Sequence, residues 1–117
     1  MDTLVAEKPG ADHDVMMENA RAASRFLKAL ANENRLLLLC LLAEGERSVS
    51  ELEAQLGLRQ PTISQQLARL RAEELVATRR DGKAIYYSLA SEEARRVVQL
   101  LYELFCEPAT AVTTKRP

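Results

Sequence analysis

The 117-residue chain contains no tryptophan, one histidine, two cysteines, four glycines and four prolines. So few turn-forming residues argue against a protein made of many short strands. A membrane-spanning helix needs roughly 20 apolar residues, and the longest apolar run extends only from Leu36 to Ala43. The N-terminus also lacks the basic and apolar regions of a signal peptide. We therefore expect a cytoplasmic protein with no membrane partner, whose cysteines are thiols at rest.

Nearly equal numbers of opposite charges, 16 Lys and Arg against 17 Asp and Glu, exclude a polybasic protein that wraps nucleic acid. The charges are nevertheless unevenly placed. Residues 1–58 hold six basic and ten acidic side chains, whereas residues 59–117 hold ten basic and seven acidic ones. Ordinary scatter produces such a difference, but so does a localised anion-binding face, because nucleic-acid binding depends on a patch rather than on total charge.

The apolar pattern predicts one mainly α-helical domain over residues 14–107, between disordered tails at residues 1–13 and 108–117. A first helix is expected from about Asp14, because apolar residues recur there at spacings of three and four. After a short break, Asn32 is placed to cap a second helix. That helix is so rich in leucine that we expect it at the centre of the fold.

A short helix, a tight turn and a longer helix follow. Ser48 or Ser50 is placed to cap the predicted helix Glu51–Leu56, with Ser48 at capping-box spacing from Glu51, and Gly57 ends the helix. Pro61 favours the first turn of the next helix, which is expected to extend to about Glu74. This order and spacing are typical of a helix-turn-helix.

Two β-favouring runs, Leu75–Arg79 and Ala84–Leu89, flank an Asp-Gly pair, which is a strong hairpin signal. Ser91 is placed to cap a last helix, Glu92–Cys106. Four helices, a hairpin wing and a C-terminal helix make a winged helix-turn-helix. The apolar stripes of the first and last helices are too wide for one small domain, so we expect them to form a dimer interface.

The helix that begins near Pro61 carries hydroxyl and amide side chains, which both donate and accept hydrogen bonds as base edges in the major groove require. Basic side chains follow on that helix and around the hairpin, where they are placed to contact phosphates. A solvated helix start beside a charged turn is the plainer interpretation, but the agreement of several features favours DNA contact. The predicted DNA-binding residues are Gln60, Thr62, Ser64, Gln65, Arg69, Arg79, Arg80 and Lys83.

Residues 60–71 (QPTISQQLARLR) and 75–89 (LVATRRDGKAIYYSL) closely resemble the recognition helix and wing of ArsR-type winged-helix repressors. Leu30–Leu36 resembles the break between the first two helices of that family. The resemblance implies a bacterial homodimer that binds double-stranded operator DNA and dissociates from it when an inducer arrives. Two departures are visible, because Gln66 stands where many members have histidine and Glu74 where many have glycine.

Many members of that family sense metals, so metal ligands have to be considered. Residues 50–54 contain no cysteine at the positions that resemble the family's thiolate site, and the last helix contains no histidine. His13 lies in the predicted N-terminal tail. We therefore expect neither a metal nor a resident cofactor. The oxygen ligands of note in the last helix are Ser91, Glu92, Glu93 and Glu103.

The two cysteines, Cys40 and Cys106, lie 66 residues apart. From the residues alone, both are explained as small buried side chains. In their local sequences, LCL and LFCE, they resemble the dithiol of the sulfide- and persulfide-responsive branch of the family, the SqrR and BigR type. This resemblance implies that the reduced dimer represses and that reactive sulfur species link the two thiols. There are two alternatives. The cysteines could sense peroxide by forming a disulfide, or they could bind a metal ion or haem.

Functions of other classes fit less well. An enzyme is not indicated, because the sequence offers no histidine near a nucleophile, no glycine-rich phosphate loop and no evident pair of carboxylates. A winged-helix adaptor that binds another protein is a further alternative. A gel-shift experiment with the protein's own promoter region separates it from a DNA-binding protein.

Overall fold

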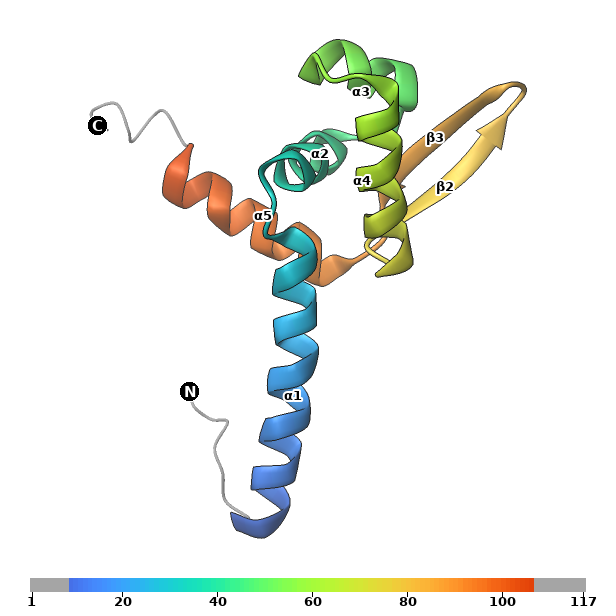
Figure 1. Cartoon of the computed structure of the whole chain (residues 1–117). Coiled ribbons are helices and arrows are strands. Elements are labelled where there is room, and N and C mark those ends of the chain that lie inside the picture. Colours follow the sequence, from blue (N-terminus) through green and yellow to red (C-terminus); the bar gives the residue numbers. More distant parts are fainter. Residues whose placement is uncertain (1–8, 107–117) are drawn as a thin grey trace.

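The computed structural model describes residues 9–106, and residues 1–8 and 107–117 lie outside the described part. The described chain is mainly helical and has the predicted winged-helix order (Figure 1). Its elements are α1 (Pro9–Leu30), α2 (Glu33–Glu44), β1 (Arg47–Ser48), α3 (Val49–Leu56), α4 (Gln60–Ala72), β2 (Val76–Asp81), β3 (Ala84–Leu89) and α5 (Glu92–Phe105).

The start of α1 corrects one predicted boundary. The helix begins at Pro9 rather than at Asp14, so residues 9–13, which the sequence placed in the N-terminal tail, belong to α1. Proline suits the first turn of a helix, because its missing N–H has no intrahelical partner there and its fixed φ is helical. The rest of the predicted N-terminal tail, and all of the C-terminal one, lie outside the described residues.

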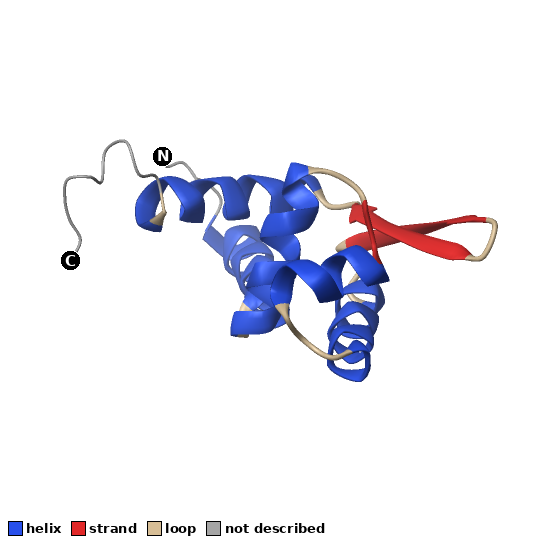
Figure 2. Ribbon diagram, turned by 90° about the horizontal axis from the view of Figure 1, so that it is seen from above, coloured by secondary structure: helices blue, strands red, loops and turns tan. Residues whose placement is uncertain are grey.

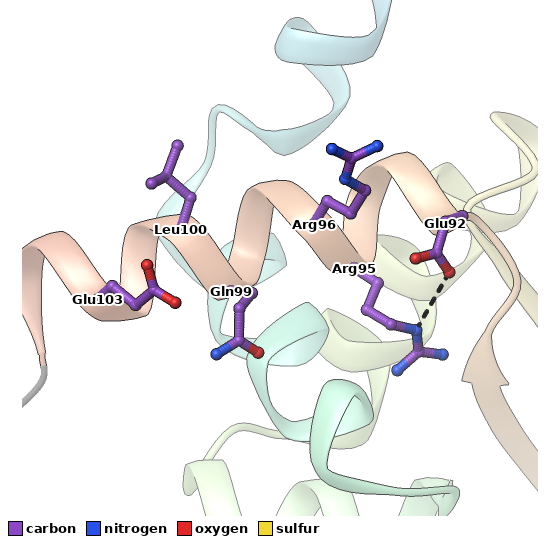
Figure 3. Close-up of a pocket in the computed structure, with 6 residues that line it drawn as sticks. All are labelled: Glu92, Arg95, Arg96, Gln99, Leu100 and Glu103. Carbon is purple, nitrogen blue, oxygen red and sulfur yellow. Dashed lines mark ion pairs between the residues drawn. The ribbon is translucent and has the colours of Figure 1, made fainter.

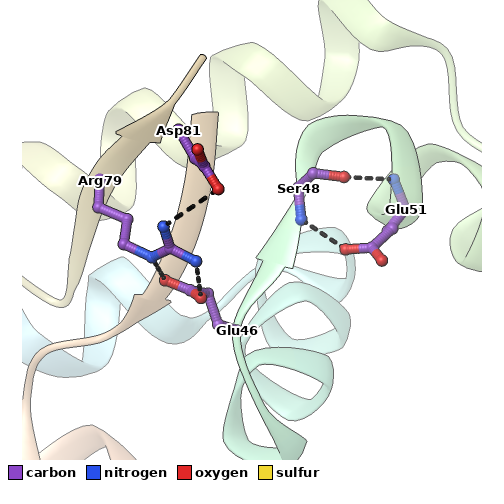
Figure 4. Close-up of polar contacts among 5 residues, drawn as sticks. All are labelled: Glu46, Ser48, Glu51, Arg79 and Asp81. Carbon is purple, nitrogen blue, oxygen red and sulfur yellow. Dashed lines mark hydrogen bonds and ion pairs between the residues drawn. The ribbon is translucent and has the colours of Figure 1, made fainter. Parts of the chain in front are cut away.

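The predicted caps are confirmed. Asn32 accepts a hydrogen bond from the backbone N–H of Arg35 at 3.1 Å and so starts α2. Ser91 caps α5 in the same way, accepting from the backbone N–H of Ala94 at 3.0 Å. Ser48 and Glu51 form the expected capping box of α3, which starts at Val49 because Ser48 itself is the cap (Figure 4).

The predicted hairpin is present, and a short strand completes a three-stranded antiparallel sheet in the order β1-β3-β2. Gly82 makes the hairpin turn with φ of 66°, in the left-handed region that favours glycine. Figure 2 shows the β2–β3 hairpin projecting from the helical body as a wing. Strand β1 has only two residues, too few for an alternating pattern to predict it. Glu74 also has a positive φ, 63°, at the position where glycine is common in the family it resembles.

Helix α2 lies at the centre of the fold, as its leucine content predicts. Figure 1 shows it between α5 and α4, and its Leu38 and Leu39 are completely buried. Helix α1 differs, because only its C-terminal part reaches the core, through Phe26, Ala29 and Leu30, while the rest of the helix extends away from the body (Figure 1). No helix among residues 9–106 is long and apolar enough to cross a membrane.

Candidate nucleic-acid interface and thiol groove

Helix α4 is anchored by one apolar face and presents the opposite face to solvent. Ile63, Leu67 and Leu70 are completely buried beneath it. The predicted contact residues are placed around the remaining face, with Gln60, Gln65 and Arg69 exposed and Thr62 and Ser64 half-buried. A helix held in this way presents its polar N-terminal side chains and free N–H groups outward, as a recognition helix requires.

The three predicted cations of the wing differ in their surroundings. Arg80 and Lys83 are exposed near the hairpin turn, and no ion pair within residues 9–106 involves either side chain. Arg79 instead donates two hydrogen bonds to Glu46, from Nε at 2.8 Å and from Nη2 at 2.9 Å (Figure 4). These hydrogen bonds, together with the charge of Glu46, raise the pKa of Arg79. Within residues 9–106, the wing therefore carries two cations without such a partner and a third, Arg79, whose positive charge is balanced by Glu46.

A separate polar contact joins the recognition helix α4 to α2 and to the end of α1. The Arg35 guanidinium donates to the carbonyls of Ala29 at 2.6 Å and Lys28 at 3.2 Å, and to Gln66 Oε1 at 2.9 Å. Because a guanidinium only donates hydrogen bonds, the oxygen of Gln66 faces Arg35 and its amide NH₂ is left for another acceptor. Burial and the nearby charge of Arg69 lower the pKa of Arg35.

Neither Arg35 nor Glu46 was among the predicted site residues. Each has its partner 31 or 33 residues away, so no local spacing in the sequence indicates the contact. For the Arg35–Gln66 contact, the one feature of the sequence that draws attention to the position is Gln66 itself, which stands where many members of the resembled family have histidine.

The structure brings the two cysteines together. Cys40 of α2 and Cys106, at the end of α5, line one groove of about 320 Å³. Cys40 is half-buried and Cys106 is exposed, and both are free thiols. The surface of the groove is apolar, although Glu33 and Tyr102 contribute to its lining; the remaining lining residues are Leu36, Leu37, Leu101 and Phe105.

The surroundings of Cys40 make its thiolate less favourable. Burial is the main cause that raises the pKa of Cys40, followed by the electrostatic influence of the neighbouring Cys106 and Glu44. Cys40 is therefore a neutral thiol at neutral pH, and its reactivity increases as the pH rises toward its pKa.

We expect the two thiols to be alkylated in a fixed order. Cys106 should react with iodoacetamide first because it is exposed, and Cys40 should follow more slowly. Below its raised pKa, the Cys40 rate should increase about tenfold for each pH unit, because only the thiolate reacts. Peptide mass spectrometry over a pH series measures both rates. A Cys40 rate that does not change with pH would contradict the assigned protonation state.

The oxygen ligands considered in the last helix do not gather into a metal site. Glu92 and Glu103 line a groove of about 330 Å³ on α5, and Figure 3 shows Arg95 and Arg96 between them. Arg95 pairs with Glu92 at 3.7 Å. Within residues 9–106, no group of three or more His, Cys, Asp or Glu side chains is placed to hold a metal ion. His13 is exposed on α1.

A helix-turn-helix with a polar recognition helix, followed by a cationic wing, defines a winged-helix DNA-binding regulator. Residues 32–78 match the family described as "Bacterial regulatory protein, arsR family". The biofilm growth-associated repressor of Agrobacterium fabrum is 50% identical over 93 residues, which cover 80% of each chain.

Solved structures agree with this match. The repressor BigR from Xylella fastidiosa superposes with a TM-score of 0.75 at 45% identity, covering 81% of this chain and 97% of that one. Reduced HlyU from Vibrio cholerae superposes with a TM-score of 0.77 at 43% identity, covering 79% and 97%. The chain belongs to the arsR family of bacterial regulatory proteins. It is a transcriptional regulator of the BigR and HlyU type and not an enzyme.

Proposed function

We propose that this regulator is a cytoplasmic, homodimeric repressor that releases its operator when reactive sulfur species link Cys40 to Cys106. The observation that carries the proposal is the shared groove, in which two cysteines 66 residues apart in the sequence face one apolar space of about 320 Å³. Packing alone explains a buried cysteine, but it does not explain why the exposed Cys106 lines the same groove as Cys40.

A low-molecular-weight persulfide, RSSH, supplies both the sulfur and the oxidising equivalents. Each cysteine thiolate attacks the outer sulfur of one RSSH, forming a protein persulfide and releasing RSH. The persulfide anion of one cysteine then attacks the inner sulfur of the other, so that hydrosulfide leaves and the link closes. Two thiols and two RSSH thereby give one Cys40–S–S–S–Cys106 link, two RSH and one H₂S.

The room in the groove favours a link that contains extra sulfur. A direct disulfide requires Cα atoms about 4.4–6.8 Å apart, and each inserted sulfur lengthens the link by up to about 2 Å. The groove has space for inserted sulfur, and its mostly apolar lining suits polarisable sulfur atoms. We therefore propose a polysulfide link. A plain disulfide formed by peroxide is the alternative that experiment separates.

The position of Cys40 suggests how the link reaches the DNA-binding elements. Helix α2 packs against α5 on one side and against α4 and β3 on the others. A link between Cys40 and Cys106 fixes α2 to the end of α5. In a dimer held by α5, this constraint changes the spacing of the two recognition helices, and the operator is released.

The apolar side chains that α1 and α5 leave in solvent support the homodimer. Large apolar side chains that are exposed close together on a helix mark an interaction surface. Two-fold symmetry would place the recognition helices about 34 Å apart, one turn of DNA, over a palindromic operator. The apolar residues that are about half exposed or more are Val15, Met16, Met17 and Leu27 on α1 and Leu100, Tyr102, Leu104 and Phe105 on α5.

We assign the DNA contacts by side-chain chemistry. Gln60, Thr62, Ser64 and Gln65 of α4 are proposed to meet base edges in the major groove. The phosphate contacts are assigned to the cations of α4 and of the wing, because these contacts supply affinity and not sequence information. The proposed phosphate contacts are Arg69, Arg79, Arg80 and Lys83.

Gln65→Ala should reduce the discrimination between operator and random DNA by about 1–3 kcal/mol, because an amide that reads a base edge contributes that much. Gln65 is exposed on α4, so the variant should fold normally. Fluorescence anisotropy with both duplexes measures the ratio of the two affinities. An equal loss on both duplexes would show that Gln65 contacts the DNA backbone instead.

The proposed function is tested by titrating the reduced protein against its own promoter region, before and after treatment with a persulfide. We expect binding by the reduced protein and release by the persulfide. Failure to bind would favour the protein–protein adaptor. Release by peroxide alone, or only on addition of haem or a metal ion, would select one of the alternative inducers.

A further inference from the structure

The base of the wing holds an ion pair that the assigned DNA contacts would have to break. Glu46, in the connection between α2 and β1, accepts hydrogen bonds from Nε and Nη2 of Arg79 at 2.8 and 2.9 Å (Figure 4). Both carboxylate oxygens accept a hydrogen bond, in the bidentate geometry with which arginine binds both carboxylates and phosphates. Glu46 therefore occupies the donors that Arg79 would offer to a DNA phosphate.

The neighbours of Arg79 hold the guanidinium in this position. Tyr86 lies directly opposite Arg79 in the β2–β3 ladder, and its ring centroid is 4.7 Å from the guanidinium carbon. Asp81 approaches the third nitrogen, Nη1, at 3.9 Å. A cation stacked on a ring and faced by two carboxylates is well placed and largely neutralised before any DNA arrives.

The pair is nevertheless accessible to an incoming phosphate. The side chain of Arg79 is 54% exposed and that of Glu46 is 33% exposed. Ion pairs in such surroundings are weak because water screens them. A phosphate of the DNA backbone, in the strong negative field of the duplex, therefore competes with Glu46 for the same guanidinium.

We propose that Glu46 is an internal competitor of DNA, which holds Arg79 until a backbone phosphate displaces it and so limits the affinity of the wing for any duplex. The proposal rests on the DNA binding proposed above. Displacement leaves the Glu46 carboxylate unpaired beside the DNA. Because the contact is to phosphate, Glu46 should lower the affinity for operator and random DNA equally.

The test compares Glu46→Gln with Glu44→Gln. Both substitutions remove one negative charge from the same stretch of chain, but Glu44 pairs with Arg47 at 2.9 Å and not with the wing. Fluorescence anisotropy of the reduced protein, with a promoter duplex and a random duplex over a salt series, gives the affinities. The melting temperature of each variant shows that it is folded.

Glu46→Gln should bind both duplexes about two- to fivefold more tightly at low salt, the range expected when an exposed ion pair no longer has to break. Its salt dependence should be steeper by up to about one unit of slope, because in the wild type the unpaired Glu46 carboxylate takes up a cation and offsets the counterion released from one phosphate. Glu44→Gln should bind like the wild type. In an Arg79→Ala background, the gain from Glu46→Gln should be smaller, because no guanidinium remains to be released.

Several outcomes would overturn the proposal. Unchanged or weaker binding by Glu46→Gln would show that the carboxylate positions Arg79 rather than competes for it. An equal gain in Glu44→Gln, or in the Arg79→Ala background, would reduce the effect to general charge repulsion. A wild type that binds neither duplex overturns the proposed function itself, and this inference with it.

Discussion

Cys40→Ser and Cys106→Ser are each expected to bind the promoter nearly as well as the wild type and to be insensitive to persulfide. Neither cysteine lies on the exposed face of α4 or on the wing, so the reduced complex should be preserved. Loss of either thiol removes one end of the link. Allosteric coupling commonly changes affinity about 5- to 150-fold, and each variant should lose the whole of the change that the wild type shows.

Two control variants distinguish loss of the Cys40–Cys106 link from an effect of the substitutions on packing. Cys40→Ala tests whether a polar hydroxyl in the half-buried position of Cys40 is harmful in itself, and it should behave as Cys40→Ser does. The double serine variant should be no less responsive than either single variant, because the two thiols act as one unit. Normal release of the promoter by persulfide in either single variant would leave only the packing role for these cysteines.

Leu104→Glu is expected to convert the protein to monomers and to weaken promoter binding by about 10²- to 10⁴-fold, the gain that a second linked binding site typically provides. Leu104 is 64% exposed on α5, in the surface that we assign to the dimer. In a two-fold interface each substitution occurs twice, so two carboxylates are placed in an apolar contact. Sedimentation velocity measures the mass, and anisotropy measures the affinity.

Leu104 does not line the thiol groove, so the effect of this substitution is separate from that of the cysteines. Leu104→Met keeps an apolar side chain of similar volume and should remain dimeric. A dimeric Leu104→Glu protein with unchanged affinity would place the interface elsewhere on the molecule.

The fold could be predicted largely from local signals. Asn32, Ser48 and Ser91 start their helices as expected, because a cap acts on the N–H groups of its own first turn. The hairpin is also placed by a local signal, because Gly82 supplies the left-handed φ of the turn, although the turn residues are Gly82 and Lys83 and Asp81 belongs to β2. The start of α1 was misplaced because Pro9 and Gly10 are typical of loops as well as of the first turn of a helix.

The contacts between distant residues could not be predicted in this way. The Arg79–Glu46 and Arg35–Gln66 hydrogen bonds join elements that become neighbours only after α2, α4 and the sheet have packed. The sequence identified Arg79 as a cation but not its partner, so it overstated the free charge of the wing. The pairing of Cys40 with Cys106 was implied by the family resemblance, and their common groove is a property of the α2–α5 packing.

The most direct test of the central claim is the mass of the linked wild-type protein, with its link located by peptide mapping after persulfide treatment and loss of promoter binding. We expect one peptide pair within a single chain, Cys40 joined to Cys106, heavier than the plain disulfide by the mass of one or more sulfur atoms. A reductant should restore both the thiols and promoter binding. Release of the promoter with both cysteines still reduced, or linked only between different chains, would contradict the account.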